Sequence, residues 1–503
     1  MSTPPAAPSD VDVAVVGAGF GGLGAALRAA ELGHRVAAFE SLAYPGGCAS
    51  TFTRGGASYE AGATLFAGLG PGGFFQRCLA AHGLHAPVRL LDPVLHVRAP
   101  DLALDVPADR AAFVDLWTQV EPEHAAAIRA FFARQQELAA ALWSLFEDPA
   151  LLPPFDTRAF LRHARGALRY APLLRWMGRS LGAMLDAFGL GGARRLRSYL
   201  DALCQITVQA TADEAEAPFA LAAIDYPFRG TGHVVGGIGV LASTMVDAVR
   251  IAGGEVRLTD RVKSITREGS GFRLHTRRGE VRARHVVLNL VPSAVATLLG
   301  RPIGEHRELA RLDAGVRAGW GAVMLYRVVR DEGLLAADPH HVDLTARLGV
   351  PPTLGHHVFC SVSGAAEDTA GPGLRTVTAS THLPMPADGS PPDAALVAEV
   401  QERMRATIAS GYPALADATV REMTASPRTF ARFVGRPGGY VGGIPRRVGL
   451  HHYRTLGPRP IEPGVWMVGD TAFPGQSILA AAIGGWKTAE ALEAPARALR
   501  RSG

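Results

Sequence analysis

The 503-residue sequence predicts an α/β fold. We expect a parallel sheet covered by helices and built from discontinuous segments, beside a second, antiparallel or mixed sheet and a helical part. Three observations predict it. An apolar segment near the N-terminus leads through a glycine-rich turn into an Ala/Leu-rich helix, residues 108–205 are dense in Ala, Leu and Arg, and strand signals return after Gly236. With 48% hydrophobic and 19% charged residues, the chain can bury a large core, which excludes disordered, collagen-like and small disulfide-bonded proteins.

The first elements form one βαβ unit. Residues 11–16 are apolar and rich in valine, which predicts a buried parallel strand. After the glycine-rich turn a helix is expected over residues 23–32, with Gly33 at its C-terminal cap. A second strand follows over residues 35–39 and ends at Glu40.

Later segments are predicted from the same signals. The helix-rich stretch is interrupted by Pro153-Pro154 and by Pro172. Further helices are expected over residues 237–252 and from about 477 to 492. Strands are expected over residues 255–259, 262–267, 272–276, 281–290, 318–330, 357–380 and 465–468.

The turn has the pattern Gly17-x-Gly19-x-x-Gly22 between a strand and a helix, and Glu40 ends the next strand, as in a dinucleotide-binding site. Gly17 permits the tight turn, Gly19 lets a pyrophosphate approach the backbone, and Gly22 lets the helix pack on the strand. The N-terminus of the helix offers free N–H groups to the phosphates. Glu40 is placed to bind ribose hydroxyls, and its charge disfavours the 2′-phosphate of NADP.

Three later motifs resemble those of flavoproteins. They are Pro45-Gly46-Gly47-Cys48, the stretch Tyr59-Glu60-Ala61-Gly62-Ala63-Thr64, and Gly469-Asp470-Thr471-Ala472-Phe473-Pro474-Gly475-Gln476. In this order they resemble the phytoene desaturase and carotenoid isomerase group of FAD-dependent oxidoreductases, within the amine-oxidase-like superfamily. Phytoene desaturases usually carry Arg after the early Gly pair. Cys48 at that position favours the isomerase, terminal-desaturase and retinol-saturase branches.

The resemblance implies FAD as the cofactor and assigns its contacts. Asp470 is expected to bind the ribitol chain, and Ile478 and Leu479 are expected beside the flavin ring. The full set of expected FAD-binding residues is Gly17, Ala18, Gly19, Phe20, Gly21, Gly22, Glu40, Ser41, Gly46, Gly47, Cys48, Ala49, Gly62, Ala63, Thr64, Val262, Gly469, Asp470, Ile478 and Leu479.

Five segments are predicted on this basis. A Rossmann-like FAD-binding domain is assembled from residues 10–90, 221–300 and 436–495. Residues 91–220 form a helical part that faces the substrate or a membrane, and residues 301–435 form the sheet of a substrate domain.

The resemblance implies an enzyme acting on a carotenoid or related polyene isoprenoid. Two reactions fit: desaturation, in which flavin N5 accepts a hydride, and flavin-dependent cis–trans isomerisation. The alternatives are a retinol-saturase-like polyene reductase and a flavin amine oxidase. A non-enzymatic alternative is a prenyl-binding protein like the GDP-dissociation inhibitors, which the intact glycine motif and Gly469-Asp470 disfavour.

No catalytic group stands out. Glu60 and His233 are candidate catalytic residues, although Glu60 can equally pair with Arg54 or cap a turn, and His233 can be an ordinary buried polar residue. The doublets His340-His341, His356-His357 and His451-His452 lack the spacing of metal ligands, so no metal is expected. Cys48 is expected to pack rather than to react.

The surface properties predict the partners and the location. A net charge of +5 is too small to indicate nucleic-acid binding. No signal peptide or apolar run of about 18 residues occurs, and the four cysteines are scattered, which predicts a cytoplasmic protein. Arg158, Arg162, Arg165 and Arg169 share one helix face, and apolar residues follow Pro172: Leu173, Leu174, Trp176, Met177, Leu181, Met184, Leu185 and Phe188. This pattern fits a solvated face equally well, or peripheral docking on the inner face of the cell membrane. The oligomeric state is not predicted.

Overall fold

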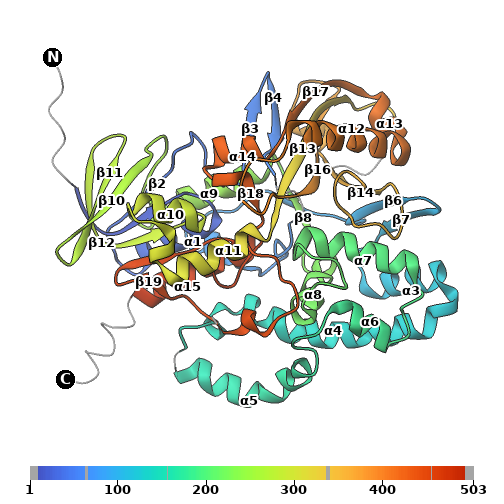
Figure 1. The fold of residues 1–503 in the computed structure, drawn as a ribbon, viewed down its shortest axis with the longest axis horizontal. Helices are drawn as coiled ribbons and strands as arrows, with labels where there is room; N and C mark the ends of the chain where they lie inside the picture. The colour runs from blue at the N-terminus through green and yellow to red at the C-terminus, as the bar shows by residue number, and fades with distance from the viewer. Residues whose placement is uncertain (1–8, 63–65, 156, 336–339, 455, 493–503) are drawn as a thin grey trace.

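The computed structural model describes residues 9–62, 66–155, 157–335, 340–454 and 456–492. In Figure 1 one sheet lies at the left, a second sheet at the upper right, and a set of helices at the lower right. The predicted α/β class with two sheets is confirmed.

The first sheet contains the predicted βαβ unit. Its strands are β1 (Ser9–Val16), β2 (Val36–Phe39), β9 (Glu255–Arg257), β10 (Val262–Glu268), β11 (Gly271–Thr276), β12 (Glu280–Leu288), β19 (Pro460–Glu462) and β20 (Val465–Met467). The order is β10-β11-β12-β1-β2-β9, and β20 pairs with β12 and with β19. The pairs β1–β2, β1–β12, β2–β9 and β12–β20 are parallel. Strands from three distant parts of the chain therefore share one sheet.

Helices cover both faces of this sheet. They are α1 (Phe20–Glu31), α9 (Ile238–Ile251) and α15 (Ile478–Leu492) on one face, and α10 (Pro292–Leu298) and α11 (Arg307–Arg317) on the other. The side chains of β1 alternate between these faces: Val13 and Val15 pack with the first set, Ala14 and Val16 with the second. The leucines of α11 pack on the first sheet. This helix therefore does not belong with the second sheet, although it lies within the predicted substrate segment of residues 301–435.

Helices α1 and α15 cross with their backbones in contact. A Cβ atom at Gly485 of α15 would lie 1.9 Å from the carbonyl oxygen of Gly21, and one at Gly24 would lie 2.2 Å from that of Ala482. Helix α1 begins at Phe20, not at Leu23 as predicted, because the last glycines of the motif already lie in its first turn. Gly21 and Gly24 of α1 form the contact surface for α15.

The second sheet is mostly antiparallel. Its strands are β6 (Leu95–Ala99), β7 (Leu102–Val106), β13 (Trp320–Arg330), β14 (His340–Thr345), β15 (His357–Val362), β16 (Leu374–Pro384), β17 (Thr419–Ala425) and β18 (Tyr440–Val441). The order is β17-β13-β16-β15-β14-β6-β7, with β18 paired to β13 and β6 parallel to β14. Helix α12 (Ala394–Gly411) covers one face, and the other face points toward the first sheet's glycine-rich segments. The segment 357–380, expected as strand, is the two strands β15 and β16 with a turn between them.

The prediction that residues 91–220 are helical is wrong for β6 and β7. These strands extend the second sheet because their alternate residues, Leu102, Leu104 and Val106, are buried against the helical part. The helices of that part are α3 (Arg110–Val120), α4 (Ala125–Glu147), α5 (Thr157–Leu174), α6 (Leu181–Ala187), α7 (Arg194–Thr207) and α8 (Ala217–Ala223).

Short elements complete the description. β3 (Thr51–Arg54) and β4 (Ala57–Glu60) form a hairpin, and β5 (Val88–Leu90) pairs antiparallel with β8 (Gly232–Val234), which is distant along the chain. The remaining helices of the described residues are α2 (Phe74–Ala80), α13 (Pro413–Asp417) and α14 (Pro427–Val434). Among the described helices, none combines the length and the hydrophobicity needed to cross a membrane.

The apolar residues beyond Pro172 are mostly core residues, so their predicted exposure to a membrane is wrong, except for Leu174, which is 67% exposed. Trp176, Leu181, Met184 and Leu185 are at most 4% exposed, because α6 packs against α8 and the rest of the helical part. Pro172 lies inside α5 near its end and does not terminate it.

Candidate functional site

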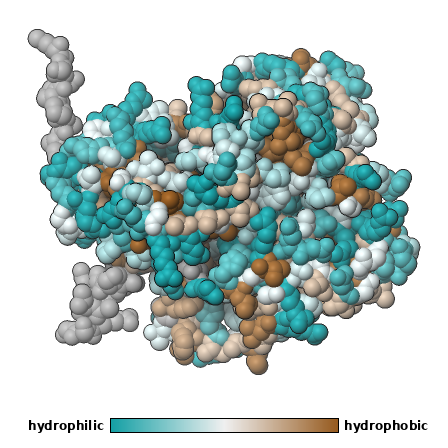
Figure 2. All heavy atoms as spheres, in the orientation of Figure 1, coloured by the Kyte–Doolittle hydropathy of each residue, from teal (hydrophilic) through white to brown (hydrophobic). Residues whose placement is uncertain are grey.

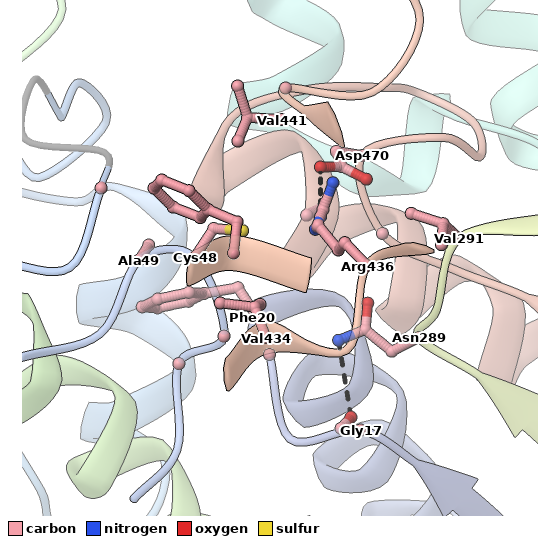
Figure 3. A pocket seen from close by; sticks show the side chains of 18 of the residues that line it. Gly17, Phe20, Cys48, Ala49, Asn289, Val291, Val434, Arg436, Val441 and Asp470 are labelled. Carbon is pink, nitrogen blue, oxygen red and sulfur yellow. Dashed lines mark hydrogen bonds and ion pairs between the residues drawn. The ribbon is translucent and has the colours of Figure 1, made fainter. Parts of the chain in front are cut away.

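A cavity of about 520 Å³ is lined by residues of both sheets. Figure 3 shows how side chains from several distant segments converge on it. Most of the predicted FAD-binding residues lie in its wall: Gly17, Gly19, Phe20, Gly21, Glu40, Ser41, Gly46, Gly47, Cys48, Ala49, Gly62, Val262, Gly469, Asp470 and Ile478.

The other predicted residues have different places. Ala18 donates its backbone N–H to the Glu40 carboxylate at 2.9 Å, directly behind the wall. Gly22 packs on the turn, where a Cβ atom would lie 2.0 Å from the carbonyl oxygen of Gly17. Leu479 is buried beside Gly68. Ala63 and Thr64 lie outside the described residues.

The glycine-rich turn is shaped to receive a dinucleotide. Gly17 has φ of +97°, a conformation that L side chains rarely adopt. The segment of the second Gly pair lies against this turn, because the N–H of Gly46 donates to the carbonyl of Ala18 at 2.8 Å. No side chain caps the N-terminus of α1, so its first N–H groups are available to an anionic ligand.

Glu40 ends β2 with its carboxylate in the cavity wall and is 8% exposed. Oε2 accepts the N–H of Ala18, and Oε1 accepts the N–H of Leu42 at 2.9 Å and the hydroxyl of Ser41 at 3.1 Å. These donors fix the carboxylate at the end of the strand. Oε1 already accepts two hydrogen bonds, but Oε2 accepts only one and keeps a lone pair, so the group also fits a ribose hydroxyl.

The opposite wall is formed by one face of the second sheet. Phe359 of β15, Ser380 of β16 and Met324 of β13 are cross-strand partners and line the cavity. His357 lines it two residues before Phe359, on the same face. Its Nε2 lies 2.9 Å from Oδ1 of Asp343, and both residues are 2% exposed. This buried pair can hold or accept a proton at the cavity wall.

Glu60 and His233, the predicted candidates for catalysis, are not among the lining residues. The Glu60 carboxylate accepts the N–H of Ile238 at 2.9 Å and the hydroxyl of Thr51 at 3.0 Å, and burial raises its pKa to about 7. His233 pairs with Glu367 at 2.8 Å. Both side chains thus support the N-terminal end of α9 and the strand before it.

Among the lining residues that sequence reasoning did not assign to the site are three polar ones: Asn289, His357 and Arg436. Asn289 follows β12, and its amide lies 3.5 Å from the carbonyl of Gly17 (Figure 3). Arg436 follows α14, and its Nη2 donates to Oδ2 of Asp470 at 2.5 Å. The only sequence signals are a polar residue at the end of a strand and an Arg in a glycine-rich loop.

One set of possible metal ligands occurs among the described residues. Donor atoms of Glu121, Glu123 and His124 lie within 4.8 Å of one another at the end of α3. Glu121 already accepts the N–H of Arg195 at 2.8 Å, which accounts for its position.

Comparison with curated proteins finds prolycopene isomerases. Prolycopene isomerase 1 of an Oncidium hybrid cultivar is 24% identical over 95% of this chain and 82% of its own length. The Arabidopsis thaliana prolycopene isomerase is also 24% identical, over 94% of this chain and 81% of its own. The human all-trans-retinol 13,14-reductase is 24% identical over 52% of this chain and 43% of its own.

Comparison with solved structures shows the same fold. An oxidoreductase from Methanosarcina mazei superposes with a TM-score of 0.65 at 18% identity, covering 95% of this chain and 100% of that chain. A putrescine oxidase with bound putrescine gives 0.61 at 18% identity, covering 97% and 100%.

The sequence also matches a family of flavoenzymes over residues 20–429, a range that includes strands of both sheets and most of the cavity wall. The predicted resemblance to the amine-oxidase-like superfamily is therefore confirmed, as is FAD, whose binding the glycine turn and Glu40 fit. The chain belongs to the flavin containing amine oxidoreductase family and is an FAD-dependent oxidoreductase.

Proposed function

We propose that the protein isomerises a carotenoid or related polyene isoprenoid in an FAD-dependent reaction, with desaturation of such a chain as the second candidate. The observation that carries this proposal is the second-sheet wall of the cavity. Its lining residues include no Asp, Glu, Lys or Arg, and are Ala322, Met324, His357, Phe359, Ser380, Thr381, His382 and Val441. An uncharged apolar chain suits such a wall, and the names of the prolycopene isomerases favour isomerisation.

An amine substrate fits this wall less well. Amines are cationic near neutral pH and need a carboxylate or an aromatic cage when buried. Asp343, which lies behind this wall, has its carboxylate paired with His357. Burial also lowers the pKa of His382 to about 4, so that this side chain is neutral. These features support a polyene over the amine-oxidase alternative.

The chain's own residues have three tasks in this proposal. Bound FAD supplies a two-electron redox centre. The glycine turn and Glu40 hold the dinucleotide, the second-sheet wall excludes water from the apolar substrate, and the His357–Asp343 pair can move a proton at that wall. A cationic polyene is stabilised by delocalisation, so no strong base is required.

The test is turnover of a poly-cis carotene presented in lipid vesicles, with the purified protein containing FAD. We expect conversion to more trans isomers without net consumption of an added quinone. Desaturation would instead consume one two-electron equivalent of acceptor for each new double bond. Oxidation of amines without any change in the carotene would contradict the proposal.

We also propose that α5 docks on an anionic membrane surface, from which such a substrate would arrive. Phe160, Leu161 and Leu168 are 65%, 49% and 86% exposed and lie on the side opposite Ala159 and Leu173, the buried residues of this helix. Figure 2 shows apolar side chains at the lower edge of the molecule, where α5 lies in Figure 1. Beside this face are the exposed Arg158, Arg162, Arg165 and Arg169. An exposed apolar face flanked by Arg is typical of helices that lie in a membrane interface.

Reversing Arg162, Arg165 and Arg169 to Glu should lower the affinity for anionic vesicles at least a hundredfold, since each basic charge near such a surface contributes about 1 kcal/mol. Vesicle co-sedimentation at low salt measures it. As a matched control, changing the exposed Arg277, Arg284 and Arg347 to Glu should lower the affinity for vesicles much less. Phe160→Ser with Leu168→Ser should weaken binding even where the charges are screened. Equal losses in the two charge-reversed variants would contradict docking through α5.

A further inference from the structure

With the diphosphate of a dinucleotide bound, the end of the cavity that holds it would contain more negative than positive charge. Glu40 and Asp470 are both in its wall, and a diphosphate adds two further negative charges. The N-terminus of α1 supplies only a partial positive charge. A buried anion of this kind needs a fixed cation close to it.

Two cationic side chains with permanent charge are found among the described lining residues, Arg261 and Arg436. Arg261 is exposed and precedes β10, near the Glu40 end of the cavity. Arg436 has a side chain that is 15% exposed and comes from the loop after α14. Of the two, Arg436 is therefore the cation that lies inside the cavity.

The guanidinium of Arg436 is held by two acceptors. Nη2 donates to Oδ2 of Asp470 at 2.5 Å, and Nη1 lies 3.4 Å from the carbonyl oxygen of Tyr440. Burial alone would lower the pKa of Arg436, but Asp470 and Cys48 outweigh it and the net shift is upward. The group is therefore charged at any ordinary pH.

The neighbours of this guanidinium are the segments that surround a diphosphate. Gly469 precedes its partner Asp470 and is so close to Gly21 that a Cβ there would lie 2.7 Å from the Gly469 nitrogen. Cys48, whose sulfur lies by the guanidinium in Figure 3, follows the Gly pair that bridges to Gly19. Gly19 and Gly21 begin α1, where the free N–H groups are.

We propose that Arg436 binds the diphosphate of FAD and that Asp470 positions its guanidinium. The ion pair occupies only one oxygen of Asp470. Oδ1 accepts no hydrogen bond from the residues that the structure describes, which leaves it for a hydroxyl of the ligand. An Arg guanidinium presents five N–H donors, so it can bind Asp470 and phosphate oxygens together.

The test uses protein from which FAD has been removed, with ADP and adenosine as probes. Arg436→Gln should weaken ADP binding tenfold to a hundredfold and adenosine binding less than twofold, because only ADP carries the diphosphate. Arg436→Lys keeps the charge but not the guanidinium fork, so it should recover part, but not all, of the ADP affinity. FAD affinity, measured by quenching of flavin fluorescence, should follow that of ADP.

Arg432→Gln is the matched control, since Arg432 is exposed on α14, one turn away and outside the cavity wall. It should leave all three affinities unchanged. Circular dichroism and thermal unfolding establish that each apo-variant is folded. Unchanged ADP affinity in folded Arg436→Gln, or equal losses for ADP and adenosine, would overturn the proposal. If Arg436→Gln does not fold, the decision rests on Arg436→Lys, whose ADP affinity must then fall while that for adenosine does not.

Discussion

Replacing Gly485 with alanine is expected to destabilise the protein by about 3 kcal/mol or more. The added Cβ atom would lie 1.9 Å from the carbonyl oxygen of Gly21 and 2.7 Å from the nitrogen of Ala25, and both are backbone atoms that cannot rotate away. The two helices must therefore separate. Since Ile478 at the start of α15 lines the cavity, FAD occupancy should fall together with stability.

The measurement is urea denaturation of the holo-protein, together with the ratio of flavin to protein after purification. Gly166→Ala in α5 is the matched control, because its Cβ would meet nothing closer than Tyr170 at 3.9 Å. That change should be neutral or stabilise the protein by up to about 1 kcal/mol through helix propensity. A folded Gly485→Ala variant as stable as the control would show that the two helices are not locked in backbone contact.

Glu40→Ala is expected to lower FAD affinity tenfold to a hundredfold. The substitution removes a carboxylate that fits ribose hydroxyls, a charge-assisted contact of roughly 1.5–3 kcal/mol. It also leaves the N–H groups of Ala18 and Leu42 without their acceptor, which loosens the glycine turn.

Equilibrium titration of apo-protein with FAD checks this expectation. Glu40→Gln retains an acceptor oxygen and should lose less affinity than Glu40→Ala. Glu255→Ala on the neighbouring strand β9 removes an exposed carboxylate that does not line the cavity, and should have no effect. Wild-type affinity in Glu40→Ala would place the ribose elsewhere.

Local chemistry explains what could be predicted from the sequence. One tight turn requires both Gly17 and Gly22, and Glu40 stands at the end of the next strand of the same βαβ unit. These residues are close together in the sequence, so this part of the site could be predicted from it. The site residues that the sequence did not predict are brought into place by strands that pair far apart in the chain. Asn289 meets Gly17 across 272 positions, and only the parallel pairing of β1 with β12 brings them together.

Short or buried segments were misjudged for a related reason. Strands β6 and β7 have five residues each, too few for periodicity to overrule the helical composition around them. Trp176 and Leu181 follow an Arg-rich helix and suggested an exposed apolar face, but tertiary packing buries them. On α5 the exposed apolar side chains are instead Phe160, Leu161, Leu168 and Leu174, which composition alone does not separate from core residues.

The scattered origin of the first sheet has a consequence for biosynthesis. The glycine turn is synthesised before Gly469 and α15, which close the other side of the cavity and lie more than 400 positions further along the chain. At roughly 5–20 residues per second, the nascent turn exists for about 20–90 s before its partners. The complete cavity wall therefore forms only after α15 has been synthesised. Until then α1 can pack on α9, but the side of α1 that contacts α15 stays uncovered.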